Sequence, residues 1–413
     1  MQLDEFTSDA PSNLPAAPLP LSVGEYGRAY GRRLRTGDLG ALPIFCGLAL
    51  IAFIFQSQNA NFLTARNFVN LIVQMAGITT IAYGVVFVLL LGEIDLSIGY
   101  VSAVAAVSMT LLLREPLAWP WWAAISAALA AAAGIGLLHG LIITLFQIPS
   151  FVVTLAGLLA WNGMVLIIIG SGGTIILQSP VIVSIANDFL PPLWGWLAGG
   201  ITVAGIVYYQ IHNRLSRRQR GLLYIPLPVM ALQLSAWAGL IFGAVYVANQ
   251  DRGVPVVGLV LLGLWVSLAL VANRTVFGRY VYAVGGNRNA ARRVGIDVDR
   301  IRILVFMLSS VMAALGGIIL ASRLRSVDTA AGSGNLLFNS IAAAVIGGTS
   351  LFGGSGRVSS AVFGALVIGG VENGMGLLGL SSGVKFVITG LVLLIAVLVD
   401  AISRRSHSQV DPG

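Results

Sequence analysis

Two carboxylates, Glu93 and Asp95, stand between two long apolar runs, in the stretch GEIDLSIG at 92–99. Acidic side chains beside hydrocarbon are costly, so they usually mark a function, a helix cap or the membrane edge. Asp95 precedes a new apolar run and is well placed as its N-cap, at the positive end of the helix dipole. Glu93 is harder to explain as a cap. Paired-carboxylate hydrolysis is excluded because apolar runs flank both residues and leave no soluble substrate cleft.

Further polar side chains interrupt the apolar runs and could line a wet path for a small solute. Amide, hydroxyl and carboxylate groups hydrogen-bond to sugar hydroxyls, and an indole can stack on a sugar ring. The alternative for each residue is an interhelical hydrogen bond worth about 0.6–2 kcal/mol. With Glu93 and Asp95, the pathway candidates are Asn70, Gln74, Thr154, Trp161, Asn162, Asn339, Ser340, Glu372 and Asn373.

The connection at 273–302 is about thirty residues long and basic, and loops of that length usually have a function. Asn287 is a good N-cap, the run RNAARRV after it predicts two helical turns, and Gly295 stands where a C′ glycine would end them. Asp297 or Asp299 is then expected to cap the next membrane helix.

The predicted short helix at 287–295 has two interpretations. It is either an ordinary positively charged cytoplasmic loop, or a docking helix that transmits motion from a soluble partner. A defined helix flanked by glycine hinges favours docking over a diffuse arginine cluster. The candidates for coupling to such a partner are Gly285, Gly286, Asn287, Arg288, Ala291, Arg292, Arg293 and Gly295.

The glycine-rich run GGTSLFGGSGR at 347–357 invites comparison with a phosphate-binding loop. It lacks the GK[ST] ending and follows no hydrophilic strand, so it fails as a Walker A motif, and its glycines are expected to break a helix or allow tight packing. If ATP drives this protein, a separate subunit must bind it. His139, His212 and His407 have no metal-ligand spacing, and the single cysteine, Cys46, can form no intrachain disulfide. We therefore expect no cofactor and no metal on this chain.

The composition decides which elements must position these residues. Hydrophobic residues make up 57% of the 413 residues and charged residues 10%, against about 25% charged in soluble domains. Apolar runs near 20 residues can cross about 30 Å of hydrocarbon. We expect an all-α polytopic membrane bundle of about 12 segments (10–14). The predicted segments are 41–58, 68–91, 97–113, 121–146, 150–170, 196–211, 225–247, 254–272, 303–321, 335–349, 358–378 and 383–401.

The segment 335–349 is short and is broken by Gly347 and Gly348. It is either a full span or a re-entrant half-helix. Irregular backbone at membrane depth is tolerated only where protein or a water-filled cavity surrounds it.

The arginines set the orientation. With the N-terminus inside, eighteen of the 24 basic residues fall on the cytoplasmic side, which follows the positive-inside rule and places both termini in the cytoplasm. The net charge of +8 is thereby explained by topology, and no nucleic-acid partner is expected. Residues 1–40 form a largely flexible cytoplasmic tail, 41–402 the membrane domain and 403–413 a second cytoplasmic tail.

Several motifs, in order along the chain from about residue 60 to 405, resemble one family. They are FLTARNFVNLIVQ at 62–74, GEIDLSIG at 92–99, IPSFVVTLAGLLAWNG at 148–163, YAVGGNRNAARRVGI at 282–296, AALGGIILASR at 313–323, AAAVIGGTSLFGGSGRV at 342–358, ENGM at 372–375 and ISRR at 402–405. The sequence is similar to the permeases of bacterial ABC sugar importers of the ribose/xylose branch. Glu93 and the extra helical stretch around 196–247 resemble the xylose type more than the shorter ribose type.

The resemblance implies a non-catalytic transport subunit of the bacterial inner membrane. Two copies would form one pore among membrane lipids, with two cytoplasmic ATPase subunits that bind ATP-Mg and a periplasmic sugar-binding protein. The implied cargo is D-xylose or a similar pentose; ribose, another monosaccharide or a nucleoside are alternatives within the family. An ion-coupled secondary transporter is the alternative from another class. It would need buried ionisable groups within helices, for which Glu372 is the main candidate.

Overall fold

A computed structural model of the chain describes residues 42–392, together with residues 22, 24, 25, 27, 28, 31, 394 and 398. The predicted tails at 1–40 and 403–413 therefore lie almost entirely outside the described residues. The described part divides into two compact units. The smaller unit contains Leu193–Tyr246, and the larger one contains Leu39–Pro192 and Val247–Gly413.

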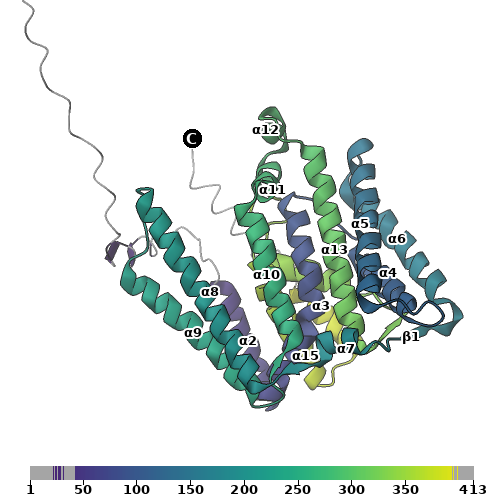
Figure 1. The fold of residues 1–413 in the computed structure, drawn as a ribbon, viewed down its shortest axis with the longest axis horizontal. Coiled ribbons are helices and arrows are strands. Elements are labelled where there is room, and N and C mark those ends of the chain that lie inside the picture. The colour runs from purple at the N-terminus through teal and green to yellow at the C-terminus, as the bar shows by residue number, and fades with distance from the viewer. Residues whose placement is uncertain are drawn as a thin grey trace, which may run out of the picture. The chain divides into compact units, whose positions relative to one another are not determined.

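The larger unit is a bundle of helices with two short strand pairs (Figure 1). Its helices are α2 (Leu42–Gln58), α3 (Ala65–Leu90), α4 (Ile98–Leu113), α5 (Trp121–Leu145), α6 (Ser150–Ile169), α7 (Pro180–Asn187), α10 (Val256–Arg274), α11 (Val276–Gly286), α12 (Arg288–Arg293), α13 (Val298–Leu324), α14 (Asn335–Ile346), α15 (Ser359–Leu377) and a last helix at Ser382–Val392. Strand β1 (Thr174–Ile176) pairs antiparallel with β4 (Ser326–Asp328), and β2 (Phe189–Leu190) pairs antiparallel with β3 (Val254–Pro255).

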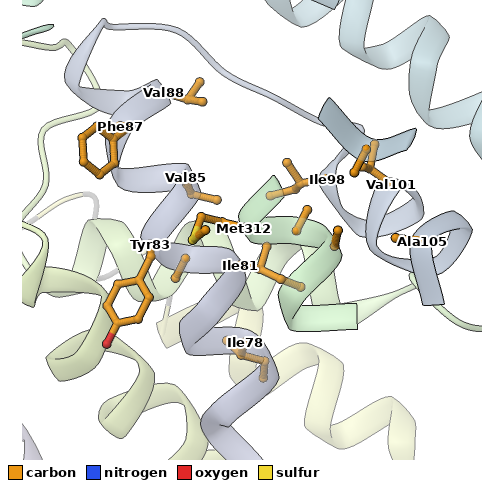
Figure 2. Packing of buried hydrophobic residues seen from close by; sticks show 14 of the residues in the cluster. Ile78, Ile81, Tyr83, Val85, Phe87, Val88, Ile98, Val101, Ala105 and Met312 are labelled. Carbon is orange, nitrogen blue, oxygen red and sulfur yellow. The ribbon is translucent and has the colours of Figure 1, made fainter. Parts of the chain in front are cut away.

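Helices α3 and α13 lie at the centre of the larger unit, where α13 packs against α3, α4 and α5. Most of α3 is buried on all sides, as expected for an apolar helix inside a bundle. Figure 2 shows Tyr83 and Phe87 of α3 in this core, with Met312 of α13 nearby. A Cβ atom at Gly84 would lie 2.9 Å from the Ser309 Cα, so the two helices approach backbone to backbone, as small residues allow in membranes.

The smaller unit is a pair of helices, α8 (Pro192–Gln219) and α9 (Leu227–Asn249). Gly221, with φ of +65°, turns the chain between them. The rings of Trp196 and Phe242 lie 6.0 Å apart across the pair. These two helices cover the predicted segments 196–211 and 225–247.

Each of the twelve predicted apolar runs overlaps a helix. Among the described residues, seven helices are long and apolar enough to cross a membrane: α3, α5, α6 with the 3-10 turn after it, α9, α10, α13 and α15. Four other apolar helices are shorter, namely most of α2, α4, α14 and Ser382–Val392. The count of twelve membrane segments therefore stays a prediction.

Two of the short helices begin beside each other. α14 has 12 residues, which reach about 18 Å at 1.5 Å per residue, well short of the ~30 Å hydrocarbon core. Its length favours the half-helix over the full span. A glycine loop precedes it, and the carbonyl oxygen of Gly332 in this loop leaves no room for a side chain at Gly99, at the start of α4. The irregular backbone of this loop thus packs against the first turn of α4 inside the protein, which is where such structure is tolerated.

Candidate functional site

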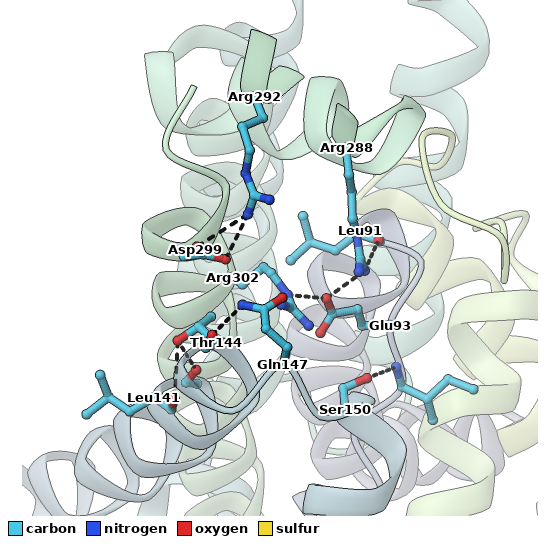
Figure 3. Close-up of polar contacts among 12 residues, drawn as sticks. Leu91, Glu93, Leu141, Thr144, Gln147, Ser150, Arg288, Arg292, Asp299 and Arg302 are labelled. Atoms are coloured by element: carbon cyan, nitrogen blue, oxygen red, sulfur yellow. Dashed lines mark hydrogen bonds and ion pairs between the residues drawn. The ribbon is translucent and has the colours of Figure 1, made fainter. Parts of the chain in front are cut away.

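Glu93 lies in the non-helical connection between α3 and α4 and is 3% exposed. Its Oε1 accepts a hydrogen bond from Arg302 Nε of α13 at 2.5 Å and another from Arg288 Nη2 of α12 at 2.6 Å (Figure 3). Arg302 is 6% exposed, whereas the Arg288 side chain is 44% exposed. We call these three residues the Glu93 cluster. It explains the carboxylate that sequence reasoning could not explain as a cap.

The same cluster changes the role expected for the arginines of α12. Arg288 Nη2 also donates to the Leu91 carbonyl at 3.2 Å, so its guanidinium is engaged within the chain. Arg292 lies 3.4 Å from Asp299, and both side chains are exposed. Arg293 is exposed as well. Of the three arginines expected to meet a partner, Arg292 and Arg293 are therefore the better placed.

The predicted helix in the basic connection is present but shorter than 287–295. α12 spans Arg288–Arg293, and the Asn287 side chain caps it by accepting from the Ala290 amide at 2.9 Å. Gly295 follows with φ of +86°, as expected of a C′ glycine. Ala291 is the buried residue of this helix. Asp297, rather than Asp299, caps α13 by accepting from the Arg300 amide at 3.0 Å.

The expectation that Gly285 and Gly286 form a flexible hinge is wrong for Gly285. Both are the last residues of α11, a helix that was not predicted and that Thr275 caps through the Gly278 amide. A Cβ atom at Gly285 would overlap the carbonyl oxygen of Leu90 at the end of α3. Gly285 is thus a close-packing position, while a Cβ atom at Gly286 would meet open space.

The glycine-rich loop at 347–357 packs against the same junction. The Gly354 amide donates to the Leu90 carbonyl at 2.9 Å, and the Tyr282 hydroxyl of α11 donates to the Gly356 carbonyl at 2.9 Å. Burial raises the pKa of Tyr282, with the charge of Arg357 opposing the shift, so the phenol remains a donor. The tight packing expected for these glycines is therefore what the structure shows.

Asp95 is buried two residues further along the α3–α4 connection. Its Oδ1 accepts from the Ser97 amide at 3.0 Å and from the Ser97 hydroxyl at 2.6 Å. The prediction of Asp95 as N-cap is wrong, because Ser97 occupies that position. Asp95 closes a turn just before the helix, and Ser309 Oγ of α13 lies 3.4 Å from its Oδ2.

A chain of hydrogen bonds runs from Asp95 to Trp161, one of the pathway candidates. Trp161 Nε1 donates to His139 Nε2 at 3.1 Å, which assigns the proton of a neutral His139 to Nδ1. That nitrogen lies 3.4 Å from Ser97 Oγ, which donates to Asp95. Sequence reasoning set His139 aside because it had no metal-ligand spacing. Its position as a lone polar residue in an apolar run was the available signal.

Thr154 of α6 holds the same connection. Its Oγ1 accepts from the Leu96 amide at 3.1 Å and donates to the Ser150 carbonyl at 3.0 Å. Asn162 is half-buried beside Trp161 on the same helix. Thr154 and Trp161 of α6 thus lie beside Asp95 of the α3–α4 connection, with His139 of α5 completing the hydrogen-bond chain.

The candidates on α3 and α15 form a separate group. Asn373 Nδ2 donates to Gln74 Oε1 at 3.0 Å and to Asn67 Oδ1 at 3.0 Å, and Asn67 returns a bond of 2.7 Å. Sequence reasoning missed Asn67. These contacts are the interhelical hydrogen bonds that were the alternative to a pathway role. Asn70 instead accepts from Arg252.

A third group joins α14 to α15. Asn339 Nδ2 donates to Glu372 Oε1 at 2.5 Å. The positive charge of Arg323 also attracts the Glu372 carboxylate. Asn339 Oδ1 is buried without a partner among the described residues. Ser340 Oγ donates to the Leu336 carbonyl of its own helix at 2.7 Å. Glu372 is therefore held by an amide, as a structural carboxylate would be.

Apolar helices around a buried polar connection define a multi-pass helical membrane protein. The chain belongs to the family described as branched-chain amino acid transport system / permease component, which matches residues 67–397. This confirms the predicted fold class as a polytopic helical membrane protein, the predicted family of ABC permeases and the location in the bacterial inner membrane.

Curated relatives cover most of the chain. The xylose transport system permease protein of Escherichia coli (strain K12) is 35% identical over 87% of this chain and 90% of its own length. That of Haemophilus influenzae is 35% identical over 90% of this chain and 99% of its own length. The ribose import permease protein of Escherichia coli (strain K12) is 33% identical, over 86% and 91%. No solved structure matches the chain significantly.

Proposed function

We propose that this protein is the membrane-spanning subunit of an ATP-driven importer for a monosaccharide, D-xylose or a similar pentose. The observation that carries the proposal is the similarity, over nearly the whole chain, to permeases named for xylose transport. The basic helix α12, which is capped at both ends and is joined to the buried Glu93 through Arg288, supports a docking role.

In this function the permease makes and breaks no bonds. Two copies of the chain form one pore, with both termini in the cytoplasm, two cytoplasmic ATPase subunits bind ATP-Mg, and a periplasmic binding protein delivers the sugar. The absence of a Walker A motif from the sequence supports a separate nucleotide-binding subunit. Arg292 and Arg293 on α12, which are exposed, contact acidic or carbonyl groups of the ATPase.

The polar side chains near the α3–α4 connection are the proposed lining of the sugar path. Asp95, Ser97, His139 and Trp161 combine hydrogen-bonding groups with an indole ring. α4 and α14 begin beside each other close to this group, and transporters commonly bind substrate where helices are interrupted. Motion of these two helices opens the path to one side of the membrane at a time.

The function is tested in proteoliposomes that contain the permease with its ATPase. Labelled D-xylose and the periplasmic binding protein are added outside, and ATP is enclosed. We expect uptake that requires ATP and the ATPase subunit. Uptake without the ATPase, driven by an imposed proton gradient, would instead establish the ion-coupled transporter, with Glu372 as the residue to examine.

The cargo is decided by a second measurement, because the binding protein sets most of the selectivity. The similarity to ribose import permeases makes ribose the main alternative. Calorimetric titration of the binding protein with xylose, ribose, other monosaccharides and nucleosides identifies the ligand. Tight binding of ribose alone would replace the pentose assignment and leave the importer class unchanged.

A further inference from the structure

We propose that Glu93 is a positioning residue that ties α12 to the α3–α4 connection, so that a displacement of α12 moves this connection. The inference rests on the proposed function, since it requires an ATPase that displaces α12. It assigns the transmission step to the Glu93 cluster, whose two arginines come from different elements: Arg288 from the docking helix and Arg302 from the central helix α13.

α12 is too short to be stable by itself, because a helix of 6 residues barely exceeds the nucleus of a single turn. Its position therefore depends on its attachments. Ala291 is buried, and Arg288 reaches Glu93 Oε1 at 2.6 Å. The second ion pair of α12, from Arg292 to Asp299, is longer at 3.4 Å and exposed. Glu93 is thus the buried charged group to which α12 is attached.

The other end of the attachment leads into the polar group of the membrane domain. Along the connection, burial alternates: Glu93, Asp95 and Ser97 are buried, while Gly92 and Ile94 are exposed. Gly99 lies six positions after Glu93 and abuts the loop before α14. A displacement of the Glu93 carboxylate is therefore transmitted along a short length of chain to the start of α4.

The charges allow the Arg288 contact to be made and broken repeatedly. One carboxylate faces two guanidiniums, and both donate to its Oε1, while Oε2 has no partner among the described residues. If Arg288 leaves, Arg302 still compensates the buried Glu93, and Arg288, being 44% exposed, returns to water. The departure leaves no buried charge unpaired, which is the condition that makes breaking an ion pair strongly unfavourable.

The inference is tested by replacing Glu93→Gln and Arg288→Gln separately and together in the reconstituted complex. The measured quantity is the number of ATP molecules hydrolysed per sugar imported. We expect each single variant to raise this ratio by about 5-fold or more, the lower end of typical coupling between distant sites. The double variant should be no worse than Glu93→Gln alone, because that substitution already removes the contact with Arg288. Arg300→Gln, an exposed arginine of α13 near Arg302, is the charge-matched control and should leave the ratio unchanged.

A merely structural role would lower the yield of folded complex and leave the ratio of the surviving complex unchanged. Wild-type ratios in both Glu93→Gln and Arg288→Gln would overturn the inference. If Glu93→Gln fails to fold, Arg288→Gln decides alone, because its side chain is half-exposed and Glu93 keeps Arg302. Failure of the wild-type chain to bind an ATPase or to import sugar with ATP would overturn the proposed function instead.

Discussion

Arg302 and Glu93 are separated by 209 positions in the sequence and form an ion pair of 2.5 Å in which both side chains are nearly inaccessible to solvent. The pair fixes the end of α3 to the start of α13, the two helices at the centre of the bundle. Because Arg288 joins the same carboxylate oxygen from α12, the Glu93 side chain links the α3–α4 connection, the central helix α13 and α12.

The two arginines of the Glu93 cluster should differ in their effect on stability. Arg302→Ala removes the buried partner, and we expect a loss of about 3–5 kcal/mol in the free energy of unfolding, the usual result of breaking a buried pair. Arg288→Ala removes a half-exposed partner and should lose about 1 kcal/mol or less. Denaturant unfolding in detergent compares them. Equal losses would contradict the unequal burial of the two side chains.

The adjacent glycines at the end of α11 provide a matched pair of variants. Gly285→Ala places a Cβ atom onto the Leu90 carbonyl, and overpacking of this kind destabilises by about 1–3 kcal/mol. Gly286→Ala enters open space and should be neutral or stabilise the protein slightly. Thermal unfolding of the two purified variants checks the difference. A tolerated Gly285→Ala would mean that α11 and α3 are less closely packed than described.

The amide group on α3 and α15 should behave as a structural network. Asn373→Ala breaks the contacts to Asn67 and Gln74 and should cost about 1–2 kcal/mol. The Asn67→Ala and Asn373→Ala effects should be non-additive in the double variant, since the two residues share their bonds. Sugar uptake per folded molecule should stay at the wild-type level. A selective loss of uptake would restore Asn373 and Gln74 as pathway residues.

The orientation can be tested by labelling introduced cysteines, because Cys46 is the single native cysteine and can be replaced first. In a Cys46→Ser background, Arg293→Cys on α12 should react with a membrane-impermeant thiol reagent only from the cytoplasmic side. Gln178→Cys, at an exposed position between β1 and α7, should react only from the opposite side. The positive-inside distribution of arginines predicts this pattern. Labelling of both positions from the same side would refute the predicted topology.

The sequence predicted the helices well because long apolar runs leave few alternatives in a membrane. It also located α12, since Asn287 and Gly295 are local signals that act within one turn. It missed α11, whose residues were assigned to a loop because they lie next to arginines and glycines. The stretch VFGRYVYAVGG is helical because Thr275 caps it and its glycines pack against α3, and the second cause is not local.

Pairings between distant residues were beyond sequence reasoning for the same reason. Glu93 was singled out by its chemistry, but its two arginine partners come from other elements. Asp95 was assigned as a cap because acidic residues favour helix N-termini, but the N-cap is Ser97, two residues further along the chain. Asn67 has no distinguishing signal in the sequence around it. Its role in the interhelical network depends on hydrogen bonds with Asn373, 306 positions away.

The alternation of burial along the α3–α4 connection makes its length as important as its composition. The buried residues Glu93, Asp95 and Ser97 are interleaved with the exposed Ile94 and the half-buried Leu96. Deleting one residue after Gly92 would exchange the buried and exposed positions of the segment. Ile94 and Leu96 would then point at Arg302 and Ser309, in place of the carboxylates of Glu93 and Asp95. The connection therefore tolerates conservative substitutions more readily than insertions or deletions.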